Sequence, residues 1–143
     1  LYFDEGYDYT TFRAWLLEPL APGGNRRCRT AMLDRYNDVL LPEEWHEVPD
    51  DGIVVVDGIF LLHPELAPHW DYLIWLDVDV ETMVARALQR DAIVVGSAAA
   101  VKQRYRRFRQ PVYEHYERLA SPAERAHAVV DNRDVERPRL LRI

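Results

Sequence analysis

Residues 53–56, which read Ile-Val-Val-Val, form an apolar run without alternation that ends on Asp57 and Gly58. β-Branched side chains on both faces are typical of an inner strand in a parallel sheet that helices cover on both sides. An acid at the carboxyl end of such a strand lies at the edge where open α/β sheets bind ligands. Because burying an unpaired carboxylate is costly, Asp57 needs a cation or several hydrogen-bond donors nearby.

The residues alone support two interpretations of Asp57. In the first, its carboxylate faces a Mg²⁺-bound nucleotide at the edge of the sheet. In the second, it caps the short helical turn that follows Gly58. The sequence pattern leaves both interpretations open.

Composition narrows the class of protein. A formal net charge of −6 disfavours a general nucleic-acid binder, which is normally basic. The one cysteine, Cys28, excludes an internal disulfide framework and a CxxC zinc site, and it agrees with a cytoplasmic location. No apolar run approaches the roughly 20 residues that span a bilayer, so we expect no membrane segment. We expect residues 1–143 to form one domain.

The first part of the chain predicts one helix and one edge strand. Helical spacing of apolar residues indicates an amphipathic helix up to Leu20, with Asp8 or a threonine after it as the N-cap. Residues 26–34 predict an edge strand, and residues 36–52 predict a loop because prolines and an Asp-Gly pair punctuate them.

The middle of the chain predicts a second buried strand and a helix. Residues 61–66 resemble a short helix, and residues 72–77 are apolar until they end on Asp77. We expect this second strand to lie parallel to the first as its neighbour. Asp79 is a natural N-cap for a helix over residues 80–91.

The last part predicts a long helix and a final strand. After a looser stretch at residues 92–96, a helix begins near Ser97, and Pro111 should kink or divide it. Residues 126–132 predict a last short strand and turn. The core side of the long helix is predicted to carry Val101, Tyr105, Phe108, Val112 and Leu119. Strands alternating with helices favour an α/β fold, a doubly wound sheet.

Three features of this fold converge on one edge of the sheet. Asp57 and Asp77 end the two strands, Arg86 and Arg90 lie on one face of a later helix, and an acidic, aromatic loop at residues 7–9 comes first. Phosphoryl transfer needs a carboxylate to hold Mg²⁺ and cations for the charge on the transferring oxygens. Arginine suits the second task because its planar fork meets phosphate oxygens bidentately.

Plainer interpretations of the same residues stay open. Arg86 and Arg90 are also compatible with a solvated helix face, since exposed charges are usually just solvated. Asp77 is also explained as a strand-end cap. The basic stretch at residues 102–109 is either an exposed face or a strip for RNA, and the acidic total disfavours RNA.

Six segments spread over nearly the whole chain follow one order: residues 54–62 (VVVDGIFLL), 70–78 (WDYLIWLDV), 86–91 (RALQRD), 104–105 (RY), 111–114 (PVYE) and 129–132 (VVDN). Together they resemble the uridine kinase family. Residues 19–24 (PLAPGG) are similar to bacterial uridine kinase-like proteins. The resemblance implies an ATP- and Mg²⁺-dependent nucleoside kinase of the P-loop NTPase type, with a doubly wound parallel sheet that is incomplete at its N-terminus.

The resemblance also implies roles for individual residues. Asp57 matches the acid that helps to hold Mg²⁺, and Asp8, beside Tyr7, matches the aspartate that grips the ribose hydroxyls of the substrate. Arg86 and Arg90 match the lid-helix arginines near the phosphates, which places them in the catalytic set.

Two further residues belong to the implied nucleotide and nucleoside contacts. Arg104 lies where the family places a nucleoside-contacting glutamine, and Asn132 falls in the loop that approaches the adenine of ATP. Residues 92–118 correspond to an arginine-rich lid region. The implied partners are a nucleoside or related small alcohol and, because members of the family often assemble, a second copy of the chain.

The chain departs from the family in two places. The phosphate loop GxxxxGK(S/T) does not occur, and Lys102 is the one lysine in the sequence. Backbone amides and a lysine normally cradle the phosphates, so we expect the chain alone to be inactive and the loop to lie in an N-terminal segment that precedes it. Around residues 32–36, the aromatic residue and the histidine that recognise pyrimidines are missing.

Alternatives to a uridine kinase-like activity follow from these departures. One is another P-loop small-molecule kinase, phosphoribulokinase-like or pantothenate kinase-like. The other is a non-catalytic binding domain that has lost the phosphate loop.

Overall fold

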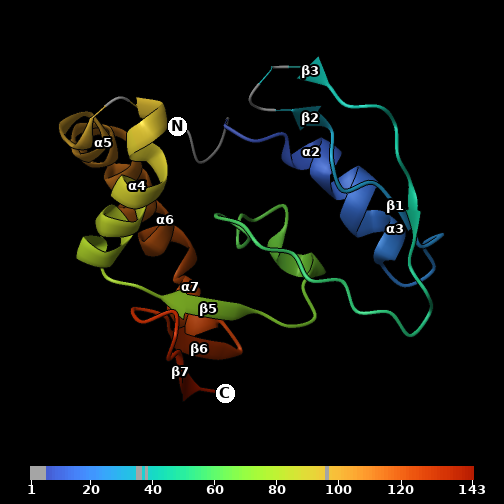
Figure 1. The fold of residues 1–143 in the computed structure, drawn as a ribbon. Coiled ribbons are helices and arrows are strands. Elements are labelled where there is room, and N and C mark those ends of the chain that lie inside the picture. Colours follow the sequence, from blue (N-terminus) through green and yellow to red (C-terminus); the bar gives the residue numbers. More distant parts are fainter. Residues whose placement is uncertain (1–5, 35–36, 38, 96) are drawn as a thin grey trace. The chain divides into compact units, whose positions relative to one another are not determined.

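The computed structural model describes residues 6–34, 37, 39–95 and 97–143, with the backbone alone at 91–95. The described chain divides into two compact units, which meet in sequence between Trp70 and Asp71. Figure 1 shows the helices and strands of both units. The expectation of a single domain over residues 1–143 stays a prediction.

A helical segment opens the first unit and confirms the predicted helix. It consists of α2 (Tyr9–Phe12), the wider π-helical turn η1 (Arg13–Leu17) and α3 (Glu18–Leu20). Asp8 caps its start by accepting a hydrogen bond from the backbone N–H of Thr11 at 2.9 Å. The helix ends at Ala21, whose extended backbone follows Pro19 in the last turn.

The core of this unit forms where the helix packs against later loops. Its buried residues are Tyr9, Leu16, Leu17, Cys28 and Leu66. Four short strands lie around them: β1 (Arg27–Cys28), β2 (Leu33–Asp34), β3 (Val39–Leu40) and β4 (His46–Glu47). β1 pairs with β4 and β2 with β3, each antiparallel. The predicted strand at 26–34 is therefore broken into two short pieces, and the predicted loop at 36–52 carries their partners.

The apolar run at 53–56 is not a strand, so the prediction of a buried inner strand is wrong. Residues 53–59 have no strand assignment, and the side chains of Ile53 and Val55 are 90% and 87% exposed. Of the run, Val56 packs against the core. A β-branched run becomes a strand only where neighbouring strands accept its backbone hydrogen bonds. In this unit the short strands pair with one another instead.

The segment after the run also differs from its prediction. Residues 61–66 form turns rather than a short helix, and one turn of 3₁₀-helix, η2 (Ala67–His69), follows them. His63 accepts the backbone N–H of Glu65 through Nδ1 at 3.3 Å, which closes the local turn. Pro64 and Pro68 lack the N–H groups that a regular α-helix would need at these positions.

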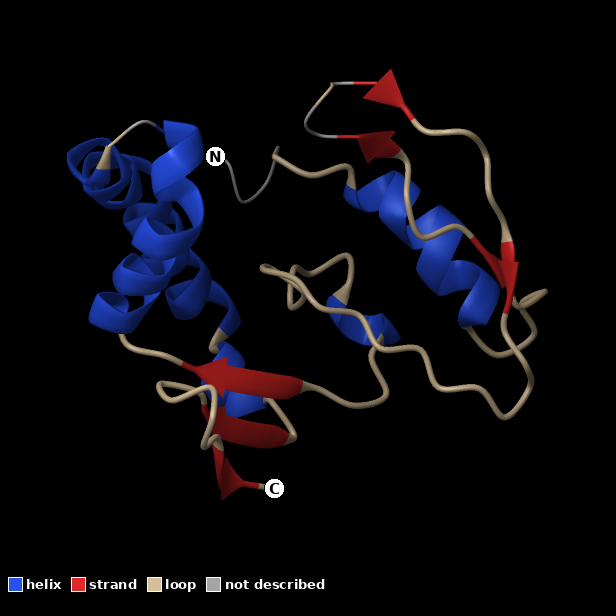
Figure 2. Ribbon diagram, viewed as in Figure 1, coloured by secondary structure: helices blue, strands red, loops and turns tan. Residues whose placement is uncertain are grey.

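The second unit contains a mixed three-stranded sheet, drawn in red in Figure 2. β5 (Ile74–Asp77) pairs in parallel with β6 (Ala128–Asp131), and β6 pairs antiparallel with β7 (Arg139–Arg142). The predicted strands at 72–77 and 126–132 are thus confirmed. The predicted parallel neighbour of β5 is wrong, because β6 takes that place and the run at 53–56 is not a strand. The class of the fold is α/β, with a mixed sheet.

Helices fill the chain between β5 and β6. α4 (Val80–Val95) begins at Asp79, whose Oδ1 accepts the N–H of Thr82 at 2.7 Å, as predicted. α4 continues through the stretch predicted to be loose. The helix predicted to begin near Ser97 is α5 (Ala98–Arg104), and Ser97 caps it by accepting the N–H of Ala100 at 3.2 Å.

The long helix is divided ahead of Pro111, as expected. The π-helical turn η3 (Tyr105–Arg109) joins α5 to α6 (Gln110–Ala120), and the proline occupies the first turn of α6, where it lacks the N–H that would bond a carbonyl of the preceding turn. Two predicted core residues are wrong: Phe108 and Leu119 are 60% and 62% exposed. The π-helical turn adds a residue to the helical repeat and shifts every later side chain around the axis. The buried residues are Val101, Tyr105, Tyr116 and Ala120.

The unit ends with a short helix and two strands. α7 (Pro122–Arg125) follows Ser121, whose left-handed backbone turns the chain out of α6. Arg142 in β7 donates through Nη2 to the carbonyls of Ala123 and Ala126, which ties α7 to the sheet. Among the residues that the structure describes, none of the helices combines the length and the apolarity that crossing a bilayer needs.

Candidate functional site

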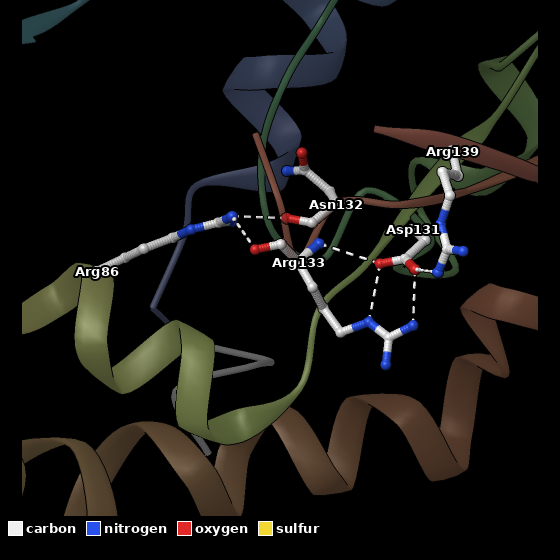
Figure 3. A network of polar contacts seen from close by, with 5 residues as sticks. All are labelled: Arg86, Asp131, Asn132, Arg133 and Arg139. Carbon is white, nitrogen blue, oxygen red and sulfur yellow. Dashed lines mark hydrogen bonds and ion pairs between the residues drawn. The ribbon is translucent and has the colours of Figure 1, made fainter. Parts of the chain in front are cut away.

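The carboxylate of Asp131 anchors a cluster of arginines at the end of β6 (Figure 3). Arg133 donates to it from Nε at 2.8 Å and from Nη2 at 2.6 Å, and its backbone N–H adds a third bond at 3.1 Å. Arg139 donates from Nη2 at 2.8 Å. These bonds hold the pKa of Asp131 well below its usual range and raise the pKa of Arg133. Asp131 and Arg133 are thus both ionised near neutral pH.

Local sequence explains this geometry. Asp131 ends β6, and the chain returns as β7, where Arg139 is the register partner of Asp131. The Asp131 residue is 4% exposed, and a buried carboxylate needs charged donors close by. Sequence reasoning singled out only Asn132 in this turn and missed Asp131, Arg133 and Arg139. One sequence signal could have indicated this cluster: Asp131 lies at the end of a predicted strand, and Arg133 follows it by two residues.

A second arginine interaction reaches the same turn from α4. Arg86 donates through Nη2 to the backbone carbonyl of Asn132 at 2.6 Å and to that of Arg133 at 3.2 Å. The N–H of Asn132 donates to the carbonyl of Asp77 at 2.9 Å. The structure therefore brings together two of the predicted site residues, Arg86 and Asn132, at the carboxyl ends of the parallel strands β5 and β6.

A hollow of about 440 Å³ lies beside this turn. It is lined by Asp131, Arg133, Asp134, Arg137 and Arg139. The volume lies in the range of small-molecule sites, and three arginines against two aspartates leave the lining positive by one charge. Because Asp131 is already bonded to two of these arginines, the hollow suits a ligand with polar or anionic groups.

The other predicted residues of the second unit are exposed. Arg90 follows Arg86 by one turn of α4 and is exposed. Arg104, at the end of α5, is exposed as well. Their roles near phosphates and nucleoside stay predictions.

In the first unit, Tyr7 and Asp8 lie in the turn before α2. The bonds from Thr11 lower the pKa of Asp8, so this carboxylate is charged near neutral pH. The Tyr7 ring is 43% exposed. Its centroid lies 6.0 Å from that of Tyr9 and 5.8 Å, edge to face, from that of Phe60. The capping role of Asp8 is confirmed, and its role toward a ribose stays a prediction.

Asp57 lies in the exposed loop three residues before Phe60. Phe60 is 1% exposed and has a left-handed backbone, with φ of 62°, which is costly for a bulky residue. Its contact with Tyr7 brings the Asp57 loop and the Tyr7–Asp8 turn together within one unit. The side chain of Asp57 is exposed. Both interpretations of it, as a cap of the following turn and as a partner of a cation, stay predictions.

The described side chains do not form a metal cage by themselves. Nowhere in residues 6–34, 37, 39–90 and 97–143 do three or more His, Cys, Asp or Glu side chains gather as such a cage would require. Mg²⁺ commonly binds through one or two carboxylates together with substrate phosphates and water. An exposed carboxylate such as Asp57 fits that mode of binding.

Comparison with known families identifies the chain. A model of the Phosphoribulokinase / Uridine kinase family matches residues 21–136. This chain belongs to that family. The matched range includes Asp57, Arg86 and Asn132, whereas Tyr7 and Asp8 precede it. Neither the curated proteins nor the solved structures contain a significant match.

Membership in the Phosphoribulokinase / Uridine kinase family supports a general activity. Its members are P-loop kinases of the ATP-dependent class, which act on small molecules and in general use Mg²⁺. The chain is therefore related to kinase-type transferases, and the resemblance to uridine kinases is confirmed at the level of the family.

Proposed function

We propose that this chain is part of a uridine kinase-like enzyme that moves the γ-phosphoryl group of ATP to the 5′-hydroxyl of a nucleoside. The observation that carries the proposal is the family match over residues 21–136. We further propose that the complete protein has the doubly wound parallel sheet of P-loop kinases and is cytoplasmic. A homo-oligomer is the proposed assembly.

In this proposal each side chain has one task. Asp57 would hold Mg²⁺, which would supply positive charge against the phosphates of ATP. Asp8 accepts hydrogen bonds from the ribose hydroxyls, and Tyr7 lies beside it as a partly exposed aromatic surface. The 5′-oxygen bonds to the γ-phosphorus as the bond to the β–γ bridging oxygen breaks, so that ADP leaves. The hydroxyl proton passes to the carboxylate of an acidic residue, which we propose lies outside these 143 residues.

The remaining proposed contacts concern charge and the nucleotide. Arg86 and Arg90 supply positive charge near the transferring phosphoryl group when residues 92–118 close as a lid. Arg104 contacts the nucleoside, and Asn132 lies near the adenine. Since the 143 residues contain no GxxxxGK(S/T) loop, we propose that phosphate binding needs a segment outside them.

A second enzyme function is compatible with the same match. The family description names phosphoribulokinase beside uridine kinase, so a phosphorylated sugar is an alternative acceptor. The pantothenate-like alcohol rests on the sequence resemblance alone.

The test is a phosphoryl-transfer assay on the protein as its gene encodes it. Labelled ATP with Mg²⁺ is offered with ribonucleosides, ribulose 5-phosphate and pantothenate as acceptors. Preference for a ribonucleoside supports the proposal, and preference for either other acceptor supports the alternative. Absence of transfer to any acceptor, in a protein that is folded by circular dichroism, supports the non-catalytic binding domain.

A further inference from the structure

We propose that Arg86 is a positioning residue, which holds the turn after β6 in place for the nucleotide. This inference rests on the proposed function and deepens it, because it gives Arg86 a task in addition to supplying charge near phosphates. It starts from the two backbone carbonyls that its Nη2 contacts, those of Asn132 and Arg133, shown in Figure 3.

The turn is held on its N–H side by the sheet. The N–H of Asn132 donates to Asp77 in β5, and the N–H of Arg133 donates to the carboxylate of Asp131. These bonds leave the carbonyls of the same two residues to find other partners. Carbonyls at the end of a strand otherwise bond water, and the turn would then be held from one side only.

Arg86 holds the turn through its carbonyl groups. Its guanidinium is charged at all physiological pH values, so the bonds to the carbonyls are charge-assisted and stronger than neutral ones. The bond to the carbonyl of Asn132 is partly buried, which reduces competition from water there. Both bonds to the turn come from the one nitrogen Nη2, so a single donor group fixes both carbonyls.

The elements that this contact joins connect it to nucleotide binding. Arg86 and Asn132 are 46 residues apart, and the bond joins α4 to the turn that borders the arginine-lined hollow. Losing the bond should loosen the turn and weaken nucleotide binding, whereas losing a charge that acts only in the transition state would lower kcat and leave binding unchanged.

The experiment compares Arg86→Gln, Arg86→Lys and the wild type as full-length proteins. The matched control is Arg125→Gln, which removes an exposed arginine charge from α7, outside residues 92–118 and the hollow, and leaves the bonds to the turn intact. Amide hydrogen exchange at residues 132–134, without nucleotide, reports on the turn. Calorimetry with MgATP reports on binding, and steady-state kinetics separate KM for ATP from kcat.

We expect Arg86→Gln to speed exchange at these amides and to weaken MgATP binding about tenfold, the scale of one charge-assisted hydrogen bond. KM for ATP should rise with the binding constant. Arg86→Lys should recover part of both effects because it restores a charged donor, and Arg125→Gln should match the wild type.

Two results would overturn the inference. Unchanged exchange in Arg86→Gln would show that the contact does not hold the turn. Faster exchange with unchanged MgATP binding and a lower kcat would assign Arg86 to the chemical step instead. If the wild type binds no MgATP, the proposed function fails and the nucleotide part of the inference fails with it, while the exchange data still decide whether Arg86 anchors the turn.

Discussion

Asp131 and Arg139 are register partners across the antiparallel strands β6 and β7, and Arg139 Nη2 lies 2.8 Å from Asp131 Oδ2. Arg133 completes the cluster from the connecting turn. This arrangement closes the hairpin through side chains as well as through backbone pairing. It also keeps a nearly buried carboxylate ionised, which makes its contribution to stability depend on pH.

The first prediction concerns that dependence. The pKa of Asp131 is lower in the folded chain than in the unfolded one, so its contribution to stability is complete above the unfolded value of about 3.9 and is lost as the pH falls through the folded value. Asp131→Asn should therefore lower Tm at neutral pH, and the difference from the wild type should shrink in acid.

Thermal unfolding followed by circular dichroism at about pH 7 and about pH 3 checks this prediction. Asp134→Asn is the control, because the Asp134 carboxylate accepts the backbone N–H of Glu136, which an asparagine oxygen can also accept. A Tm difference for Asp131→Asn that is equally large at both pH values would contradict the assignment.

A second prediction tests the exposed run at 53–56. Ile53→Thr and Val55→Thr should each change the free energy of unfolding by less than about 0.5 kcal/mol, since both side chains are already in water. Leu62→Ala, at a position that is 5% exposed, should cost about 2–5 kcal/mol. Urea denaturation of each variant measures these values. A loss of stability above about 1 kcal/mol at Ile53 or Val55 would mean that the run is buried, as a strand would be.

A third prediction tests the shift that the π-helical turn introduces into the long helix. Tyr116→Ala should cost about 3–5 kcal/mol, by analogy with other buried aromatic residues, because Tyr116 is 5% exposed. Leu119→Ala should cost less than about 0.5 kcal/mol. Urea denaturation of the two variants in parallel measures these losses in the free energy of unfolding. A larger loss for Leu119→Ala than for Tyr116→Ala would mean that the regular helical repeat continues through η3.

A fourth prediction separates the two roles of Asp8. Asparagine is as good an N-cap as aspartate, so Asp8→Asn should preserve stability within about 0.5 kcal/mol. It removes the charged acceptor proposed for the ribose hydroxyls, and KM for the nucleoside should rise roughly tenfold or more, the scale of a charged hydrogen bond. Steady-state kinetics with the full-length protein measure KM. An unchanged KM would leave Asp8 with its capping role alone.

A fifth prediction concerns Asp57. Asp57→Asn in the full-length protein should lower kcat by at least roughly 100-fold, since even residues that only support metal ligands cost about 10–100-fold when lost. The fold should be unaffected because the side chain is exposed. Asp51→Asn, an exposed acid earlier in the same loop, is the control, and turnover with Mg²⁺ is the measurement. Near-normal turnover in Asp57→Asn would remove it from the metal site.

Structural features that depend on hydrogen bonds between residues close in sequence could be predicted from the sequence. Asp8, Asp79 and Ser97 each cap a helix by accepting an N–H three residues later, so the sequence alone indicated where these helices begin. Pro111 likewise marked the division of the long helix, because a proline acts on its own helical turn. The six ordered segments predicted the family that the match to residues 21–136 confirmed.

The tertiary structure decided what depends on partners far away in the chain. The run at 53–56 has the composition of a strand, yet a strand exists only where other strands supply hydrogen bonds, and this unit supplies none to it among the described residues. The sequence placed Arg86 on a helix but could not name the carbonyls of Asn132 and Arg133 as its partners. Helix caps are local bonds, whereas sheet ladders and long-range side-chain contacts depend on the packing of the whole unit.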